Sequence, residues 1–329
     1  MIRISIIIPV FNVENYIERC LLSVLQQDYE GIELIIVDDC SPDKSMSIAE
    51  NLLKNSRFTV KFITHKQNSG LSAARNSGIR NASGNYLYFL DSDDELYSAN
   101  AISTLVRIVN TTHADCVIGN YQQIKREIDY ISKRYSQEKL LKGYRDITHA
   151  FAAGDIPIMA WNKLISKDFL LENELFFKEG LVNEDELWTF RLILDANSIA
   201  LTGTPTYRYY VREGSIMTDK ILVRLESAVE IYSEMVHNAL CKTNDVCIWE
   251  YLGRFAFKRY MEIFTLPVNK SVKKIRYSKL RSYQKKSRKI YSGKYGLFLF
   301  HLIFPKHIGF YIMQSEVFMY MKLKNLHHD

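Results

Sequence analysis

The chain has 329 residues, of which 47% are hydrophobic and 24% charged, with 14 Gly and 6 Pro, and this composition excludes a disordered, fibrous or collagen-like protein. Its length favours one domain of about 200 residues with smaller additions. The net charge of +6 is uneven, because residues 263–329 carry 14 Lys and Arg against two acidic residues, whereas residues 1–262 carry 29 against 35, so the basic end is expected to meet an anionic surface.

The first part of the chain alternates strands with helices. Short β-branched runs without polar alternation predict strands that are covered on both faces, at 3–10, 32–39, 60–65 and 85–91. Apolar residues at helical spacing predict intervening helices at 14–27, 43–55 and about 70–80. This alternation is typical of βαβ units, so we expect an α/β fold with a mostly parallel sheet flanked by helices.

The pattern changes beyond residue 114. One more strand is predicted at 114–121, and strand character returns at 198–212. Helical patterns dominate between these strands, at 145–154, 162–173 and 184–197. Residues 220–262 predict one or two further helices.

Polar clusters follow three of the predicted strands, at Pro9 to Asn12, at Asp38, Asp39 and Asp43, and at Asp91 to Asp94. In an open parallel sheet, ligands bind at the carboxyl ends of the strands, so these clusters locate the candidate site. No GxGxxG or GxxxxGK[ST] segment occurs at any of them. This disfavours a dinucleotide-binding dehydrogenase and a P-loop enzyme.

The segment "YLYFLDSDDELY", residues 86–97, places four acidic residues in five positions after an apolar run. Such a cluster repels itself, but it becomes favourable when it holds a divalent cation and a diphosphate. Hard oxygen ligands suit Mg²⁺ or Mn²⁺, which bridge carboxylates to phosphates. The alternative interpretation is that these residues are solvated loop acids and helix caps.

Six segments carry a resemblance by their order and spacing. They are "SIIIPVFNVENYIERCLLSVLQQ", "ELIIVDDCSPD", "NSGLSAARNSGIRNASGNYLYFLDSDD", "AWNKLISKDFL", "NEDELWTF" and "YRYYVREGSIM". The chain resembles the family 2 inverting glycosyltransferases of the GT-A fold, nucleotide-sugar-dependent enzymes that build bacterial polysaccharides such as capsule and O-antigen. The resemblance covers roughly residues 4–218 and implies a transferase domain at 1–218. The helical pattern and the change in composition that follow predict a helical segment at 219–262 and a basic, aromatic tail at 263–329.

The resemblance also implies a nucleotide pocket in which Asp39 reads the edge of the base. A base N–H needs an acceptor, and Asp39 offers one at a strand end. Asn68 and Arg75 are expected to support the ribose or diphosphate, although Arg75 could also be a surface helix residue, and Asp38 could have a purely structural role. The other expected lining residues are Pro9, Phe11 and Asn12.

Asp91 and Asp93 would form the DxD motif of the family, with Asp91 near the ribose and Asp93 on a Mn²⁺ or Mg²⁺ ion. Asp94 is expected to orient its neighbours or to cap the following helix. Some relatives have a metal-ligating His near the end of the catalytic domain. No His stands at this match, which leaves Asp93, beside Asp91, as the expected protein ligand.

The family's ED motif maps to Glu184 and Asp185, in "GLVNEDELWTF". Inverting transfer is a single displacement that needs a general base for the acceptor hydroxyl, and Asp185 is the expected base. Acidic residues also stabilise the first turn of a helix, so a capping role for Glu184, Asp185 and Glu186 is the alternative.

Two other segments complete the expected site. Arg212 and Ser215 would lie in a loop that closes over the diphosphate. Trp161 and Asn162, in "AWNKL", would lie on the acceptor side, although a Trp in an amphipathic helix is also typical of a core.

The tail packs eleven Lys and Arg into residues 270–294, followed by a segment rich in Phe, Tyr and Met. The apolar run at 295–304 is too short to span a bilayer, so we expect a peripheral anchor on an anionic inner leaflet. No nucleic-acid-binding fold accompanies the basic residues, so no nucleic acid partner is expected. The alternatives are a helical subdomain that packs on the body and a contact within a homodimer.

Five scattered cysteines without a CxxC pair argue against a disulfide framework or a zinc site, and the N-terminal segment does not resemble a signal peptide. We therefore expect a cytoplasmic, peripherally membrane-bound inverting hexosyltransferase that moves a sugar from a UDP-sugar to a hydroxyl of a glycan or lipid-linked glycan.

Two other functions stay open. A sugar nucleotidyltransferase normally needs a glycine-rich, basic loop near the first strand, and "PVFNVENY" is not one. A catalytically inactive glycan-binding subunit is the second alternative. The joint presence of Asp39, Asp91, Asp93 and Asp185 argues against it, because each expected role is filled.

Overall fold

The computed structural model describes residues 1–125, 128–131, 135–211, 221–265, 269–286, 313–314 and 317. The chain divides into two compact units. The first contains residues 1–180 and 184–215, and the second contains residues 181–183 and 216–329.

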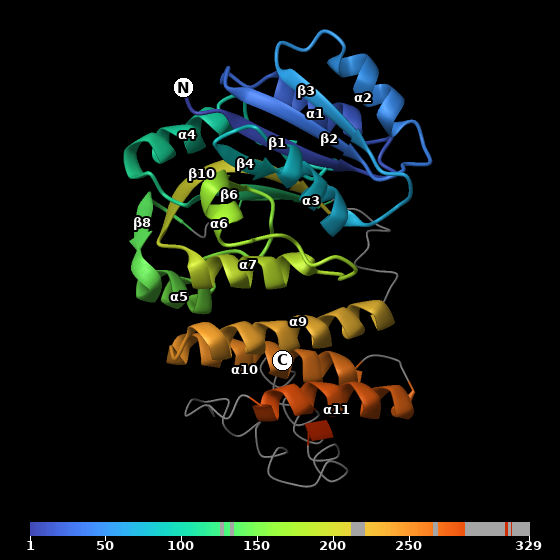
Figure 1. The fold of residues 1–329 in the computed structure, drawn as a ribbon, viewed down its shortest axis with the longest axis vertical. Coiled ribbons are helices and arrows are strands. Elements are labelled where there is room, and N and C mark those ends of the chain that lie inside the picture. The colour runs from blue at the N-terminus through green and yellow to red at the C-terminus, as the bar shows by residue number, and fades with distance from the viewer. Residues whose placement is uncertain are drawn as a thin grey trace. The chain divides into compact units, whose positions relative to one another are not determined.

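The first unit begins with the predicted alternation of strands and helices (Figure 1). The strands are β1 (Ile4–Val10), β2 (Ile32–Asp38), β3 (Thr59–Thr64) and β4 (Tyr86–Phe89). The helices are α1 (Ile17–Leu25), α2 (Ser45–Leu53) and α3 (Leu71–Asn81). The four strands are parallel, in the order β3-β2-β1-β4.

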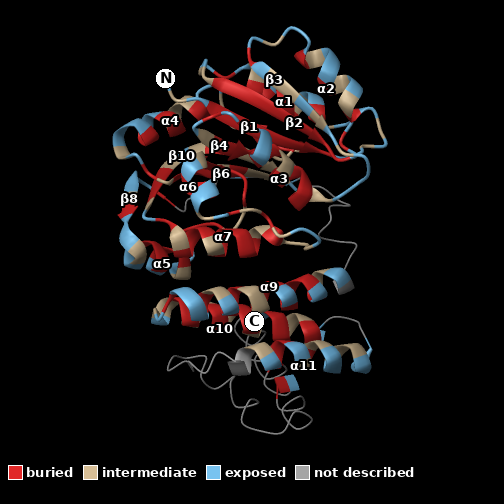
Figure 2. Cartoon of the chain, in the orientation of Figure 1, coloured by how far each residue is buried: buried red, intermediate tan, exposed pale blue. Residues whose placement is uncertain are grey.

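The two central strands are covered on both faces, as predicted, because every residue of β1 and β2 is buried (Figure 2). The prediction is wrong for β3, whose residues are exposed or only partly buried. β3 is the edge strand, so it has only β2 as a neighbour, and its apolar run leaves Phe62 42% exposed.

The sheet continues beyond β4 with mixed directions. β9 (Lys163–Ser166) lies antiparallel between β4 and β6 (Cys116–Lys125), and β10 (Ser198–Tyr210) runs parallel to β6. Three short strands that the sequence did not predict pair with these longer strands. They are β5 (Glu95–Leu96) on β10, β7 (Ile128–Ile131) on β6 and β8 (Lys139–Lys142) on β10.

The predicted helix at 162–173 is wrong in its first part. Residues 163–166 form β9, and only the following residues form α6 (Lys167–Glu172), which the Ser166 hydroxyl caps by accepting from Phe169 N. A short, mostly apolar segment is compatible with a helix or a strand. Here it forms a strand, because its backbone pairs with β4 on one side and with β6 on the other.

Three further helices belong to this unit. α5 (Gly143–Ala153) and α7 (Glu184–Asp195) confirm predicted helices. α4 (Ala101–Thr112) was not predicted, although its buried residues follow helical spacing.

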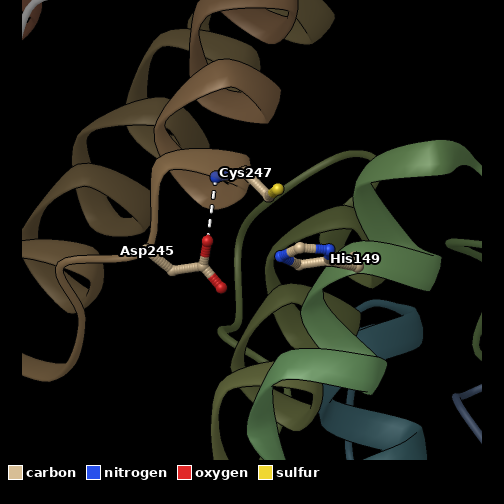
Figure 3. A group of neighbouring side chains, drawn as sticks. All are labelled: His149, Asp245 and Cys247. Carbon is tan, nitrogen blue, oxygen red and sulfur yellow. Dashed lines mark hydrogen bonds between the residues drawn. The ribbon is translucent and has the colours of Figure 1, made fainter.

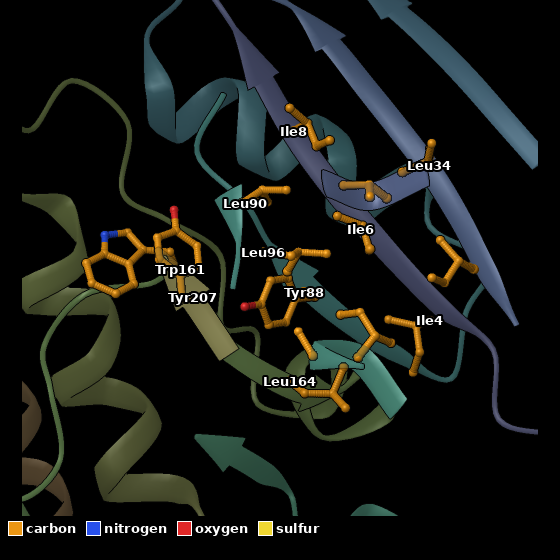
Figure 4. Packing of buried hydrophobic residues seen from close by; sticks show 14 of the residues in the cluster. Ile4, Ile6, Ile8, Leu34, Tyr88, Leu90, Leu96, Trp161, Leu164 and Tyr207 are labelled. Atoms are coloured by element: carbon orange, nitrogen blue, oxygen red, sulfur yellow. The ribbon is translucent and has the colours of Figure 1, made fainter. Parts of the chain in front are cut away.

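The core forms where the sheet meets α1 and α4. Figure 4 shows Ile4, Ile6 and Ile8 of β1 packing with Leu34 of β2 and Tyr88 of β4. On another face of β1, α3 approaches closely, because a Cβ atom on Gly78 would lie 2.3 Å from Ile7 Cγ2. This close contact fixes the helix that carries Arg75.

The second unit contains α9 (Ile221–Lys242), α10 (Val246–Thr265) and α11 (Lys270–Lys286), which confirms two helices in the region predicted for one or two. Asp245 Oδ1 accepts from Cys247 N at 2.9 Å at the start of α10 (Figure 3), the hydrogen bond of a helix N-cap. Among the described residues, no helix combines the length and apolarity that a membrane span requires.

Candidate active site

The carboxyl ends of β1, β2 and β4 lie at one edge of the sheet, because these strands are parallel neighbours. Phe11, Asp39 and Asp91 come directly after or close to these ends. The structure therefore brings together the three polar clusters, as expected from the topology.

Asp39 is only 4% exposed, and three hydrogen bonds hold its carboxylate. Its Oδ1 accepts from Ser69 N at 2.8 Å and lies 2.7 Å from His65 Nδ1, and its Oδ2 accepts from Gly70 N at 2.8 Å. A carboxylate has about four acceptor sites, so one site on Oδ2 is left for a ligand. The neighbouring Phe11 is 44% exposed and offers an aromatic surface beside it.

The other residues of the expected nucleotide pocket differ in how far they are exposed. Pro9 is buried within β1, while Asn12 and Asn68 are exposed. Asn12 has a positive φ of 54°, and its backbone N donates to Ser41 Oγ at 2.9 Å. Asp38 Oδ1 accepts from Ser41 N at 2.8 Å, which supports its structural alternative.

Arg75 joins two of the predicted motifs. Its Nη2 donates to Asp91 Oδ1 at 2.8 Å, and its Nη1 donates to Glu184 Oε1 at 2.7 Å. Arg75 is only 2% exposed, so the alternative of a surface arginine is wrong. Burial alone would lower the pKa of the guanidinium, but the charges of Asp91 and Glu184 raise this pKa above its ordinary value.

The turn that follows β4 is fixed through Asp94, which is 1% exposed. Asp94 Oδ2 accepts from the Tyr207 hydroxyl at 2.7 Å, and Oδ1 accepts from Tyr210 N at 2.8 Å. Burial raises the pKa of Asp94 well above its usual range, and the nearby charges of Asp93 and Asp91 raise it further. Asp94 thus orients its neighbours; it does not cap a helix, because strand β5 follows it.

Arg19 is a second cation at this turn that the sequence did not reveal. Its Nη2 donates to the backbone oxygen of Asp93 at 2.7 Å, and its guanidinium lies 3.6 Å from the ring centroid of Tyr210. Tyr207 and His65 are further residues that sequence reasoning missed. Arg19 and Tyr207 lie within two of the six segments that carry the resemblance, but no role was expected for either residue, and His65 lies outside all six segments.

Glu184 and Asp185 lie side by side in sequence but in different environments. Glu184 is buried and paired with Arg75. Asp185 is partly exposed, and within the described part of the chain its carboxylate makes no hydrogen bond or ion pair. The partial burial of Asp185 raises its pKa to about 7, with a further rise from the charge of Glu184 and an opposing effect from Arg75. This pKa suits a general base near neutral pH.

Trp161 lies just before β9 rather than in a helix. Its ring stacks on Tyr207, with centroids 4.4 Å apart, and on Tyr209, with centroids 5.4 Å apart. Figure 4 shows the first of these pairs at the end of the core. With 7% exposure, Trp161 supports the tyrosine that holds Asp94, which agrees with the core alternative.

Asn162 is 2% exposed and uses its whole amide inside the protein. Its Nδ2 donates to the backbone oxygens of Gly119 and Asn120, at 2.7 and 3.1 Å. Its Oδ1 accepts from Thr206 Oγ1 at 2.6 Å and from the Tyr88 hydroxyl at 3.2 Å. All four hydrogen-bonding positions of the amide are filled, so the side chain has no capacity left for an acceptor sugar.

The two loop residues expected to close over the diphosphate, Arg212 and Ser215, lie outside the described residues.

The residues after β4 fit a divalent cation. Asp91 Oδ1 accepts a hydrogen bond from Arg75, and within the described residues Asp91 Oδ2 makes no hydrogen bond. Asp93 is partly exposed on the same turn. These are hard oxygen donors, which Mg²⁺ and Mn²⁺ prefer. The charges of Asp91 and Asp93 add to the effect of burial in raising the pKa of the neighbouring Asp94, and a cation at this turn would offset these charges.

The comparisons with known proteins agree with this geometry. A family model described as "Glycosyl transferase family 2" matches residues 5–171. Glycosyltransferase GlyG of Streptococcus pneumoniae is 32% identical over 259 residues, which cover 74% of this chain and 83% of GlyG. Glycosyltransferase GlyA of the same organism is also 32% identical, over 65% of this chain but only 31% of GlyA.

The fold has a counterpart among solved structures. A crystal structure of S. aureus TarS 1–349 in complex with UDP-GlcNAc has a TM-score of 0.76 at 21% sequence identity, covering 95% of this chain and 90% of that one. The fold is therefore that of a GT-A glycosyltransferase, as expected. The chain belongs to glycosyl transferase family 2.

The contacts of Arg75 lead to a stability prediction. Arg75→Gln should lower the free energy of unfolding by about 3–5 kcal/mol, because it leaves the buried Glu184 and the partly buried Asp91 without their cation. Arg75→Lys should restore part of this loss, since a point charge can pair with one carboxylate at a time. The measurement is equilibrium unfolding in urea.

The matched control is Arg107→Gln, which breaks an ion pair with Glu138 whose side chains are 55% and 49% exposed. It should cost less than about 1 kcal/mol. Equal urea midpoints for Arg75→Gln and Arg107→Gln would contradict the structural importance of the Arg75 contacts.

Proposed function

We propose that this protein transfers a sugar from a UDP-sugar to a hydroxyl of a glycan or lipid-linked glycan, with inversion at the anomeric carbon. The observation that carries the proposal is the double contact of Arg75 with Asp91 and Glu184. This contact holds the acidic turn after β4 and the start of α7 around the Arg75 guanidinium. The donor-side carboxylates and the candidate base Asp185 therefore belong to one site.

The donor nucleotide is proposed from the pocket and from a relative. Asp39 keeps one acceptor position on Oδ2, and the exposed ring of Phe11 can stack on a base. The similar TarS structure contains UDP-GlcNAc, and TarS is named a poly(ribitol-phosphate) beta-N-acetylglucosaminyltransferase. The pocket favours a base with a ring N–H, and the likeness to TarS favours uridine among such bases.

The proposed reaction is a single displacement. The Asp185 carboxylate takes the proton from the acceptor hydroxyl while the hydroxyl oxygen bonds to the anomeric carbon and the bond from that carbon to the diphosphate oxygen breaks. UDP then leaves with the electron pair of the broken bond. Asp91 and Asp93 would hold Mn²⁺ or Mg²⁺, which when bound supplies Lewis-acid stabilisation to the diphosphate.

The family assignment weakens only one of the two alternative functions. Membership in a glycosyltransferase family gives no support to a sugar nucleotidyltransferase. A glycan-binding subunit without activity would share the same fold. The donor experiment below separates this alternative from an active enzyme.

A donor panel tests the reaction class. Purified protein with Mn²⁺ and each of the common UDP-, GDP- and TDP-sugars should release free nucleotide from one UDP-sugar, and an added glycan acceptor should speed this release. Asp93→Asn should reduce turnover by at least about 100-fold, because it removes a charged donor atom from the metal and diphosphate site. Full activity of Asp93→Asn would remove the DxD assignment.

Asp185→Asn should retain UDP binding while transfer falls by at least about 100-fold, since only the proton acceptor is lost. In the wild type, the transfer rate should fall about tenfold per pH unit below about 7, where Asp185 becomes protonated. Initial rates across pH 5.5–9 measure this profile.

The matched control is Asp168→Asn, which removes an exposed acidic residue from the first turn of α6. It should keep the wild-type rate and the wild-type pH profile. An Asp185→Asn variant that folds and transfers at the wild-type rate would exclude Asp185 as the base.

We further propose that α11 binds an anionic membrane surface, which would bring the enzyme to a lipid-linked acceptor. The helix buries Tyr277 and Leu280 and exposes Lys270, Lys274 and Lys279. Ile275 lies among these lysines and is 54% exposed, which is typical of a helix that lies in a membrane interface.

Co-sedimentation with vesicles tests this surface. Changing Lys270, Lys274 and Lys279 to Glu should abolish sedimentation with vesicles that contain 30% anionic lipid, because each basic residue contributes about 1 kcal/mol near such a surface. The control changes the exposed Lys54, Lys66 and Lys139 of the first unit to Glu, with the same change in net charge. Equal binding by both variants would contradict a role for α11.

A further inference from the structure

We propose that His65 and Ser77 set the nucleobase specificity of the donor pocket by holding the Asp39 carboxylate in one orientation. The inference rests on the proposed function and deepens it. Its substrate class is nucleoside diphosphates whose base carries a ring imino N–H, such as uracil, thymine and guanine.

The three side chains form a continuous chain of hydrogen bonds. Ser77 Oγ, on α3, lies 2.8 Å from His65 Nε2, and His65 Nδ1, at the end of β3, lies 2.7 Å from Asp39 Oδ1. The side chains of His65 and Asp39 are 14% and 5% exposed. Bulk water is therefore a poor substitute for any of these bonds.

The chemistry of the three side chains determines which atom donates and which accepts in each of these hydrogen bonds. An ionised carboxylate only accepts, so His65 Nδ1 must carry the hydrogen that it donates to Asp39. In the neutral ring, Nε2 then has a lone pair, which accepts from the Ser77 hydroxyl. Asp39 thus selects the tautomer of His65, and the bond from Ser77 fixes the orientation of the ring whose Nδ1 holds Asp39.

This arrangement decides which acceptor site remains on Asp39. Ser69 N and His65 Nδ1 fill Oδ1, and Gly70 N occupies one site on Oδ2. The carboxylate cannot rotate without losing these partners, so its remaining lone pair is on Oδ2 and accepts a single donor. Cytosine and adenine present a lone pair at the corresponding ring nitrogen, and two acceptors facing each other repel.

The side chain of His65 can be changed without removing its strand contact. Its backbone N donates to Asp38 O at 2.9 Å, which any residue except Pro can do. A substitution therefore removes the grip on Asp39 while the pairing of β2 and β3 remains. Without His65, Oδ1 has an open acceptor site, the carboxylate can turn, and discrimination between bases should fall.

Binding of UDP and CDP tests the proposal by isothermal titration of the full chain with Mn²⁺. These nucleotides differ only at the base edge, where uracil has an N–H and cytosine a lone pair. His65→Ala should weaken UDP binding about tenfold and change CDP binding less than about twofold, because a hydrogen bond to a charged group is lost only for the correct base. Its UDP/CDP affinity ratio should therefore fall at least about fivefold.

Two variants separate this role from a general loss of stability. His65→Asn keeps an N–H that can reach Asp39 but loses the bond to Ser77, so His65→Asn and Ser77→Ala should each reduce the ratio by no more than about threefold, less than His65→Ala does. The control His113→Asn changes an exposed histidine at the end of α4 and should leave both affinities unchanged.

The results have distinct meanings. A folded His65→Ala protein whose affinities for UDP and CDP are unchanged, or fall in equal proportion, would overturn the specificity role. A wild type that binds neither nucleotide would refute the proposed function, and the role of His65 would fall with it. A lower UDP/CDP ratio in His65→Ala that His65→Asn restores in part would support the inference.

Discussion

The buried guanidinium of Arg75 is the contact on which the rest of the site depends. A cation with 2% exposure is stable only when carboxylates compensate for its lost hydration, and Asp91 and Glu184 do so from positions 16 and 109 residues away. This requirement brings the turn after β4 and the start of α7 together. It also occupies Glu184, so the adjacent Asp185 keeps a carboxylate without a partner among the described residues.

The acidic turn is stabilised from its buried side through Asp94. Tyr207 and Tyr210 of β10 hold Asp94, and the stacked ring of Trp161 fixes Tyr207 in turn. Aromatic stacking and hydrogen bonds to a buried acid restrict the turn before any cation binds. For the proposed cation at Asp91 and Asp93, this restriction would lower the entropic cost of binding, which is a form of preorganisation.

Helix α3 connects base recognition with the chemistry. Gly70, at its N-terminus, donates to Asp39, the hydroxyl of Ser77 fixes His65, and Arg75 between them reaches Asp91 and Glu184. The close packing of Gly78 on Ile7 fixes this helix against β1. One rigid helix thus sets the positions of the proposed base-reading group and of the proposed reacting groups, so an error in its placement would disturb both.

The sequence by itself determined the βαβ alternation, the burial of β1 and β2, and the strand ends at which Asp39 and Asp91 stand, because hydrophobic periodicity and strand polarity are local properties. The resemblance added the expectation that Glu184 and Asp185 belong to the same active site as Asp39 and Asp91. Only the tertiary structure decided that Lys163–Ser166 is a strand, that Arg75 is buried, and that His65 meets Ser77. These features depend on neighbours that are distant in sequence, and a local pattern contains no information about which distant groups will satisfy a hydrogen bond or a charge.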